Sequence, residues 1–268
     1  MEFTRIADGL AFPEGPTWDG KTGLFVVNVY NNRLEYFRLN ASGTVEQRIL
    51  YAELPGKGNG TTLHPDGTLY VADYERKAIL KVPAPNRVEV VVERYQNQPL
   101  RGPNDLCFDR AGNLYFTDPR DSWDEPIGAV YRLDKNGTLE RIAEGLHFPN
   151  GIAIDPQERF LYVAETRRNR VLRWALKNGK IASRAPEVFT ELTKGAIGPD
   201  GMRFDSKGHL WVAHYGRGVV QLDPSGKEVA LYTLPGKGVT NLEFGGARRQ
   251  WLFVTETETN ALYRATLS

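Results

Sequence analysis

The sequence predicts an all-β protein, a six-bladed β-propeller with four-stranded blades, on the strength of three observations. A unit of apolar strand, turn and apolar strand recurs six times along the 268 residues. The units recur about every 45 residues, which is the size of a propeller blade. No segment shows a sustained helical period of apolar residues, so helices should be few. We therefore expect a single domain, residues 1–268, made of six blades.

The six copies share turn chemistry and strand composition. Their starts lie 45, 45, 46, 50 and 40 residues apart. Their turns hold Asp-Gly, Gly-Asn or Lys-Gly pairs, which tolerate the positive φ angles of hairpins. Their second strands, such as TLYVAD and HLWVAH, are rich in β-branched and aromatic residues. The copies are GPTWDGKTGLFVVN from Gly15, GTTLHPDGTLYVAD from Gly60, DLCFDRAGNLYFTD from Asp105, GIAIDPQERFLYVAE from Gly151, GMRFDSKGHLWVAH from Gly201 and NLEFGGARRQWLFVTE from Asn241.

The order of the strands also predicts how the ring closes. The stretch EFTRIADGL at residues 2–10 matches the strand that ends a blade, yet it comes first. The last copy is followed by NALYRATLS and lacks that strand. We expect the N-terminal strand to complete the last blade, because this pairing removes two open sheet edges.

Composition argues against several classes of partner. The 34 Lys and Arg residues balance 33 Asp and Glu residues, whereas nucleic acid and anionic membranes require a concentrated basic face. One cysteine allows no internal disulfide. No signal-peptide pattern and no apolar run of membrane-spanning length is present. We expect a cytoplasmic protein, a monomer or weak homodimer, without nucleic-acid or membrane partners.

The residue immediately before each copy is polar. The innermost strand of a propeller blade begins at the central channel, so equivalent positions should form a ring there. Turn chemistry explains Asn or Asp at any one position, but it gives no reason for the whole set or for a glutamate. Two carboxylates converging on a channel repel each other unless a cation neutralises them. The six positions are Glu14, Asn59, Asn104, Asn150, Asp200 and Thr240.

Hard oxygen donors of this kind favour Ca²⁺, Mg²⁺ or Mn²⁺, and carboxylate oxygens also accept Zn²⁺. Calcium is the expected ion, with the other three as alternatives. A second polar column follows the second strand of each copy and could also approach the channel mouth. Its members are Asn28, Asp73, Asp118, Glu165, His214 and Glu256.

Four separated motifs resemble those of the SMP-30/gluconolactonase/luciferin-regenerating-enzyme family. They occur in order along the whole chain: FPEGP from residue 12, RGPND with LYFTDP from residues 101 and 114, FPNG from residue 148 and GPDG from residue 198. The resemblance implies a six-bladed propeller with one divalent metal ion in its central channel. It also implies hydrolysis of lactones, and some family members act on organophosphates.

The same resemblance implies roles for individual residues. The metal ligands would be Glu14, Asn150 and Asp200, with Asn104 nearby as a ligand or a substrate contact. Asp118 in FTDP would lie near the site. Arg101 would bind substrate hydroxyl groups, although it precedes Asn104 by three residues rather than two.

Lactone hydrolysis needs a polarised carbonyl group, an activated water and a stabilised oxyanion, and one metal ion can serve all three needs. Asp200 is the first candidate for the general base and Asp118 the second, with His214 as a further possibility. Tyr30, Trp123 and Tyr215 follow strand ends and could form the walls of the substrate site.

The predicted function is therefore metal-dependent opening of a small-molecule lactone, with an aldonolactone such as gluconolactone as the expected substrate. Two alternatives stay open. One is a metal-dependent phosphotriester hydrolase, which could share the site. The other is a non-catalytic propeller that binds a ligand.

Overall fold

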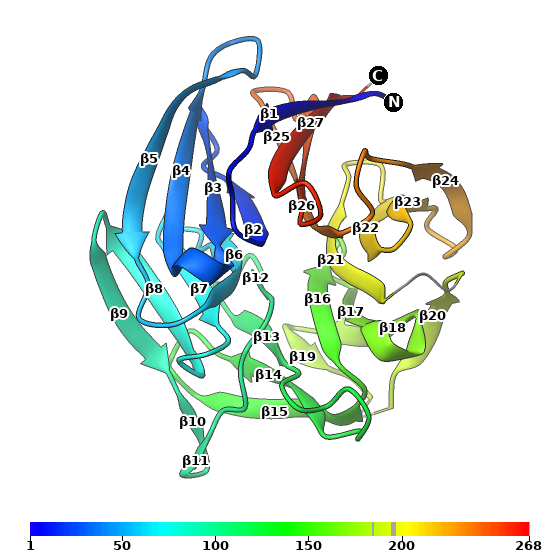
Figure 1. The fold of residues 1–268 in the computed structure, drawn as a ribbon. Helices are drawn as coiled ribbons and strands as arrows, with labels where there is room; N and C mark the ends of the chain where they lie inside the picture. Colours follow the sequence, from blue (N-terminus) through cyan, green and yellow to red (C-terminus); the bar gives the residue numbers. More distant parts are fainter. Residues whose placement is uncertain (184, 194–196, 268) are drawn as a thin grey trace.

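Six antiparallel sheets are arranged as a ring around a central channel (Figure 1). The computed structural model describes residues 1–183, 185–193 and 197–267. Each blade begins with its innermost strand, and the inner strands β2, β6, β12, β16, β21 and β25 are neighbours around the channel in that order. The predicted six-bladed propeller is confirmed.

The first three blades take up the first half of the chain. Blade 1 consists of β2 (Pro13–Trp18), β3 (Gly23–Asn28), β4 (Arg33–Leu39) and β5 (Val45–Glu53), blade 2 of β6 (Gly58–Leu63), β7 (Leu69–Asp73), β8 (Ala78–Ala84) and β9 (Arg87–Val92), and blade 3 of β12 (Leu106–Phe108), β13 (Leu114–Asp118), β14 (Gly128–Leu133) and β15 (Leu139–Leu146). A small separate hairpin lies between blades 2 and 3, formed by β10 (Arg94–Tyr95) and β11 (Gln98–Pro99).

The remaining blades follow the same order. Blade 4 consists of β16 (Pro149–Ile154), β17 (Phe160–Glu165), β18 (Arg170–Lys177), β19 (Lys180–Ile181) and β20 (Glu187–Glu191), blade 5 of β21 (Gly198–Phe204), β22 (Leu210–Tyr215), β23 (Gly218–Leu222) and β24 (Glu228–Tyr232), and blade 6 of β25 (Val239–Gly245), β26 (Trp251–Glu256), β27 (Ala261–Thr266) and β1 (Phe3–Ala7). The helices of the described residues are two short 3-10 turns, η1 (Val29–Asn31) and η2 (Thr166–Arg168).

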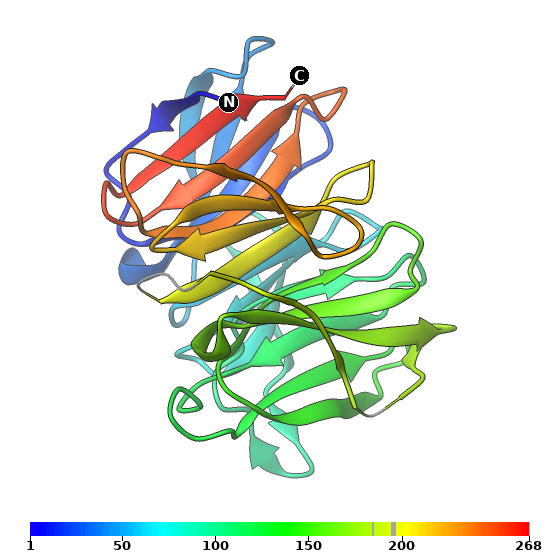
Figure 2. The same ribbon diagram turned by 90° about the vertical axis from the view of Figure 1, so that its right-hand side faces the viewer.

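The ring closes as the strand order predicts. Strand β1 pairs antiparallel with β27, with Phe3 opposite Ala265 and Arg5 opposite Tyr263. The two chain termini lie side by side in both views (Figure 1, Figure 2). This pairing covers the edge that β27 would otherwise expose.

The hydrophobic core is divided among the blade interfaces. Six clusters of buried side chains each join two neighbouring blades. Every residue of β3 is buried, because both faces of its sheet pack against another blade. The packed interfaces leave the channel as the place where polar side chains from different blades meet. Among the described residues, no helix is long and apolar enough to span a membrane.

Candidate functional site

Five of the six ring positions face one cavity at one mouth of the channel. The cavity has a volume of about 330 Å³. The sixth position, Thr240, is buried, and its hydroxyl donates a hydrogen bond to the Pro13 carbonyl oxygen at 2.9 Å. The structure therefore brings every acidic and amide side chain of the ring together. We call this group the ring floor; its members are Glu14, Asn59, Asn104, Asn150 and Asp200.

Backbone irregularities recur beside the floor residues. The pairing of β2 with β3 shifts between Glu14 and Thr17, and the pairing of β16 with β17 shifts between Pro149 and Ile152. The inner strands β6 and β21 shift at the corresponding places. A β-bulge re-aims the side chains around it and is common beside functional sites. The repeated bulge explains how residues far apart in sequence converge on one cavity.

Gly15 lets blades 1 and 2 approach closely behind Glu14. Its φ angle is +50°, and a Cβ atom at this position would lie 2.3 Å from the carbonyl oxygen of Asn59. Glycine has no Cβ atom, so it alone adopts this φ angle without strain and fits beside the carbonyl oxygen without a steric clash. The glycine of the FPEGP motif is thus required by packing, and it fixes the position of Glu14.

The two floor carboxylates are held in a strongly desolvated place. Burial is the main cause that raises the pKa of Glu14 to about 8, and the nearby charge of Asp105 adds to it. Burial, followed by the charge of Glu14, raises the pKa of Asp200 well above its ordinary value. Glu14 Oε2 accepts hydrogen bonds from the Gly15 N–H (3.0 Å) and from Asn241 Nδ2 (3.3 Å). These donors stabilise the charged carboxylate only in part.

Three floor amides have oxygen atoms that are buried and unpartnered within the described ranges. The buried Oδ1 atoms of Asn59, Asn104 and Asn150 accept no hydrogen bond from the described residues. An unsatisfied buried acceptor costs about 1–3 kcal/mol. Within the described ranges, no group of three or more His, Cys, Asp and Glu side chains is placed to share a metal ion. A cation here would therefore be held by carboxylate and amide oxygens together, a donor set that suits hard cations.

Aromatic side chains surround the floor. Tyr30, Trp123 and Tyr215, which the sequence suggests as walls, all line the cavity. Sequence reasoning missed three further aromatic residues of this wall. Phe12 and Phe148 carried a signal, since each begins a Phe-Pro motif whose third residue belongs to the floor. We call the six residues the aromatic wall; they are Phe12, Tyr30, Tyr74, Trp123, Phe148 and Tyr215.

Comparison with known proteins agrees with this architecture. The model of the family described as SMP-30/Gluconolactonase/LRE-like region matches residues 12–258. The chain belongs to this family. It is 35% identical to a protein named Gluconolactonase from Zymomonas mobilis, over 93% of this chain and 77% of the relative. It is 31% identical to Pentonolactonase XacC from Haloferax volcanii, over 95% of this chain and 85% of the relative.

Solved structures of similar proteins share the fold over the whole chain. XC5397 from Xanthomonas campestris, described as a gluconolactonase, superimposes with a TM-score of 0.87 at 27% identity, covering 99% of this chain and 89% of that one. A structure described as a putative gluconolactonase superimposes with a TM-score of 0.85 at 26% identity, covering 100% of this chain and 94% of that one.

In this SMP-30/gluconolactonase family member, Asp118 and Arg101 are not part of the cavity lining. The Asp118 carboxylate is 1% exposed and accepts hydrogen bonds from the N–H groups of Arg101 (2.9 Å) and Gly102 (2.6 Å). Arg101 lines a different cavity, together with Tyr131 and Arg141. Asp118 therefore anchors the loop that leads to Asn104, and the roles of Asp118 and Arg101 at the substrate stay predictions.

Three further residues of the second polar column have a similar anchoring role. Glu165 Oε1 accepts a hydrogen bond from the His147 N–H (2.8 Å), and Glu256 Oε1 accepts one from the Gly238 N–H (2.9 Å). Asn28 Oδ1 likewise accepts a hydrogen bond from the N–H of Ala11 (2.7 Å). Each contact holds the backbone two or three residues before a ring position. These side chains position the ring from behind.

His214 is also separated from the cavity. Its side chain is completely buried, and burial lowers its pKa to about 4. The Nδ1 atom lies 3.3 Å from the carbonyl oxygen of Tyr215. A neutral, enclosed imidazole that does not line the cavity gives no geometric support for a general base at this position.

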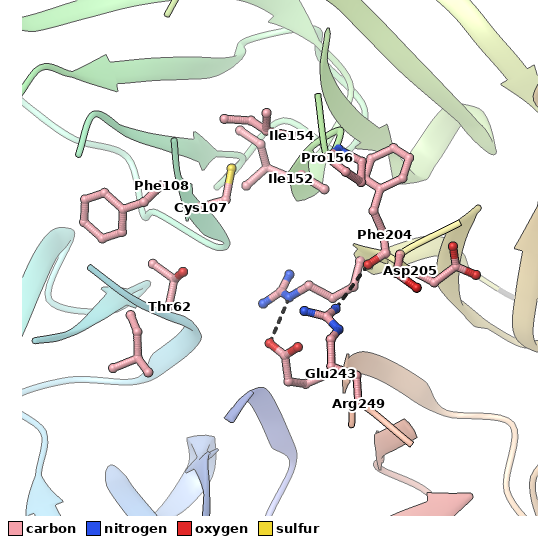
Figure 3. Close-up of a pocket in the computed structure, with 14 residues that line it drawn as sticks. Thr62, Cys107, Phe108, Ile152, Ile154, Pro156, Phe204, Asp205, Glu243 and Arg249 are labelled. Carbon is pink, nitrogen blue, oxygen red and sulfur yellow. Dashed lines mark hydrogen bonds and ion pairs between the residues drawn. The ribbon is translucent and has the colours of Figure 1, made fainter. Parts of the chain in front are cut away.

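A buried ionic cluster, which the sequence reading missed, lies further along the same inner strands. Arg203 Nε is 3.3 Å from Glu243 Oε2, and Arg203 Nη1 is 3.9 Å from Asp105 Oδ2. Glu243 lines a second cavity, at the other mouth of the channel, together with Thr62 and Cys107 (Figure 3). We call Asp105, Arg203 and Glu243 the channel cluster. Its carboxylates add negative potential beneath the floor, and Asp105 contributes to the raised pKa values of Glu14 and Asp200.

Ionisation of the floor is predicted to make the cation-free protein less stable as the pH rises. Glu14 titrates near 4.5 when unfolded and near 8 when folded. The stability that the neutral Glu14 carboxyl group contributes is fully present below pH 4.5. It is lost as the pH rises through about 8, the pKa of the folded state. Below about 6.5 the buried, neutral His214 has the opposite effect. In EDTA-treated protein, the melting temperature should therefore fall between pH 6.5 and 8.

A Glu14→Gln variant provides the control for this pH dependence, because the amide does not titrate. Its melting temperature should fall less than that of the original chain over the same interval. Parallel curves for the two proteins, recorded by differential scanning fluorimetry, would contradict the assignment.

Proposed function

We propose that this chain is a lactonase that opens a cyclic ester at the ring floor with the help of one divalent cation. The named relatives, a gluconolactonase and a pentonolactonase, support lactone hydrolysis. The observation that carries the proposal is the convergence on one cavity of two desolvated carboxylates and three amide side chains whose oxygen atoms have no partner among the described residues.

The floor residues fit a cation by charge and by donor type. Glu14, Asn150 and Asp200 would hold it, with Asn104 as a fourth ligand or a contact to the substrate. Calcium suits this oxygen set, and Mg²⁺, Mn²⁺ and Zn²⁺ are the alternatives. When bound, such an ion supplies Lewis acidity and a positive charge to the reacting ester.

The two carboxylates have different surroundings, which suggests different roles. Glu14 is 2% exposed and its Oε2 is held by two donors, so it is suited to a fixed ligand. Asp200 is only half-buried and lines the cavity. We assign Asp200 as the general base that takes a proton from the attacking water. The Asn150 side chain favours the charged form of Asp200, which lowers the pKa of that carboxyl group, and it would orient the carboxylate.

The test is a proton-release assay on a panel of lactones in weak buffer with a pH indicator. The relatives' names place D-glucono-δ-lactone and a pentonolactone first in the panel, with spontaneous hydrolysis subtracted. The protein is assayed as purified, after EDTA, and after addition of Ca²⁺, Mg²⁺, Mn²⁺ or Zn²⁺. We expect hydrolysis that EDTA abolishes and one ion restores, together with about one tightly bound ion per chain by elemental analysis.

Two results would overturn parts of this proposal separately. Hydrolysis that survives exhaustive chelation, in protein free of metal by elemental analysis, would refute the role of the cation. Absence of hydrolysis with every lactone and every ion would refute the lactonase assignment. A phosphotriester substrate in the same panel then tests the remaining hydrolytic alternative.

A further inference from the structure

The aromatic wall contains two aromatic pairs that belong to opposite sides of the ring. Phe12 and Tyr30 have ring centroids 5.1 Å apart, and Trp123 and Phe148 have centroids 5.3 Å apart. Phe12 precedes β2 and Phe148 precedes β16, and these inner strands lie three places apart in the ring of six (Figure 1). The cavity is therefore bounded by two facing aromatic pairs above the polar floor.

Both phenylalanines are held in a strained backbone conformation. Phe12 has a φ angle of 59° and Phe148 one of 54°. A bulky side chain at positive φ is a true outlier, and such strain gathers at binding sites. Glycine would adopt this backbone without cost. The presence of phenylalanine at both equivalent positions indicates that the ring itself is needed in the cavity.

The surroundings keep each strained residue in place. The Phe12 N–H donates to Asn260 Oδ1 at 3.2 Å, and the Phe148 N–H donates to the Ser122 carbonyl oxygen at 3.1 Å. The Phe148 carbonyl oxygen also accepts a hydrogen bond from the Thr166 N–H at 3.1 Å. The rings are thus preformed walls, fixed before any ligand arrives.

The acidic and amide groups of the cavity are concentrated on the floor. Outside the floor, the charged residue of the described cavity lining is Lys57, and its Nζ atom is paired with Glu75 Oε1 at 3.4 Å. The Thr166 hydroxyl donates to the Pro199 carbonyl oxygen at 2.7 Å. Ile197, which is 37% exposed, and Tyr30, which is 64% exposed, extend the apolar surface outward. A ligand deep in the cavity meets oxygen atoms at one end and hydrophobic surface around the rest.

We propose that the site prefers lactones that carry an apolar substituent on the ring over polyhydroxylated lactones. This inference rests on the proposed function, since it places the ester group at the ring floor. An alkyl substituent would then lie against the aromatic wall and lose contact with water. Several hydroxyl groups in the same place would lose water and find few charged or amide partners, which is unfavourable.

The test is a homologous series of δ-lactones that bear methyl, propyl or pentyl groups beside the ring oxygen. Burial of each methylene should raise kcat/KM about fourfold. D-glucono-δ-lactone, assayed in parallel, should have a lower kcat/KM than the pentyl lactone. A flat or falling series, or a preference for the polyhydroxylated substrate, would overturn the inference while leaving lactone hydrolysis intact.

Two wall variants and one control assign the effect to the aromatic pairs. Tyr30→Ser and Phe148→Leu should each reduce the dependence of kcat/KM on chain length. The side chain of Tyr30 is mostly exposed, so its removal should not prevent folding. Phe108→Leu is the control, because Phe108 lines the cavity at the other mouth of the channel. An unchanged chain-length dependence in both wall variants would contradict the assignment.

A binding measurement separates this inference from the proposed activity. The matching alkyl δ-lactams are stable amide analogues, and their affinity can be measured by calorimetry in protein loaded with Ca²⁺. Affinity that increases with chain length in the absence of any lactone hydrolysis would support the wall and refute the lactonase. Lactone hydrolysis together with a lactam affinity that does not depend on chain length would support the lactonase and refute the preference for apolar substituents.

Discussion

Asp200→Asn is expected to lower kcat/KM for lactone hydrolysis by about 100- to 10,000-fold, the range typical for loss of a general base. The amide keeps the size of the side chain and one oxygen donor, but it accepts no proton at neutral pH. The measurement is initial proton-release rates at saturating cation, so that weaker ion binding does not account for the loss. Calorimetry with the same ion measures that binding independently.

Asp205→Asn is the matched control for this substitution. Asp205 lies five residues further along the chain and lines the opposite mouth of the channel. Its substitution should leave the rate close to that of the original chain. An Asp200→Asn variant that stays within tenfold of the original rate at saturating cation would refute Asp200 as the base.

Arg203→Met is expected to destabilise the fold by about 3–5 kcal/mol, because it leaves buried carboxylates without their positive partner. The Arg203 side chain is 15% exposed, and both of its ion-pair partners are largely buried. Chemical denaturation of cation-free protein at neutral pH gives the free energy of unfolding. The effect should exceed that of removing a typical surface charge by several fold.

Arg249→Met controls for loss of an arginine at the same mouth of the channel. Arg249 is exposed and donates a long hydrogen bond of 3.4 Å to the Phe204 carbonyl oxygen. Its loss should change stability by less than about 1 kcal/mol. An Arg203→Met variant no less stable than Arg249→Met would show that the channel cluster contributes little to the fold.

The fold could be predicted because every blade repeats the same local rules. One sequence is enough to show the hairpin turns, the β-branched strands and the spacing of about 45 residues. Closure of the ring follows from the N-terminal strand, which resembles the last strand of a blade but precedes the first blade. The ring positions were predictable for the same reason, since equivalent positions of a repeat meet at one axis. Glu14, Asn150 and Asp200 share a cavity because their strands start alike.

The sequence alone does not specify the direction of a side chain or the path of a loop. Asp118 ends a strand near the channel, but its carboxylate turns toward the backbone of Arg101 and Gly102. Arg101 lies on a loop whose path no repeat specifies, so its cavity could not be predicted. Arg203 was missed because an isolated arginine in a strand does not reveal that Glu243, from another blade, lies beside it.

The closing strand pair has a mechanical consequence. Phe3 and Ala265 form the first rung of the antiparallel β1–β27 pair, and both chain ends leave from that edge. Tension applied through the two ends would load the rungs one at a time, as in unzipping, instead of shearing them together. Blade 6 would lose β1 first, and the tension on the N-terminal side would then pass to β2, which carries Glu14. A pulling force would therefore reach the ring floor as soon as the β1–β27 rungs have separated.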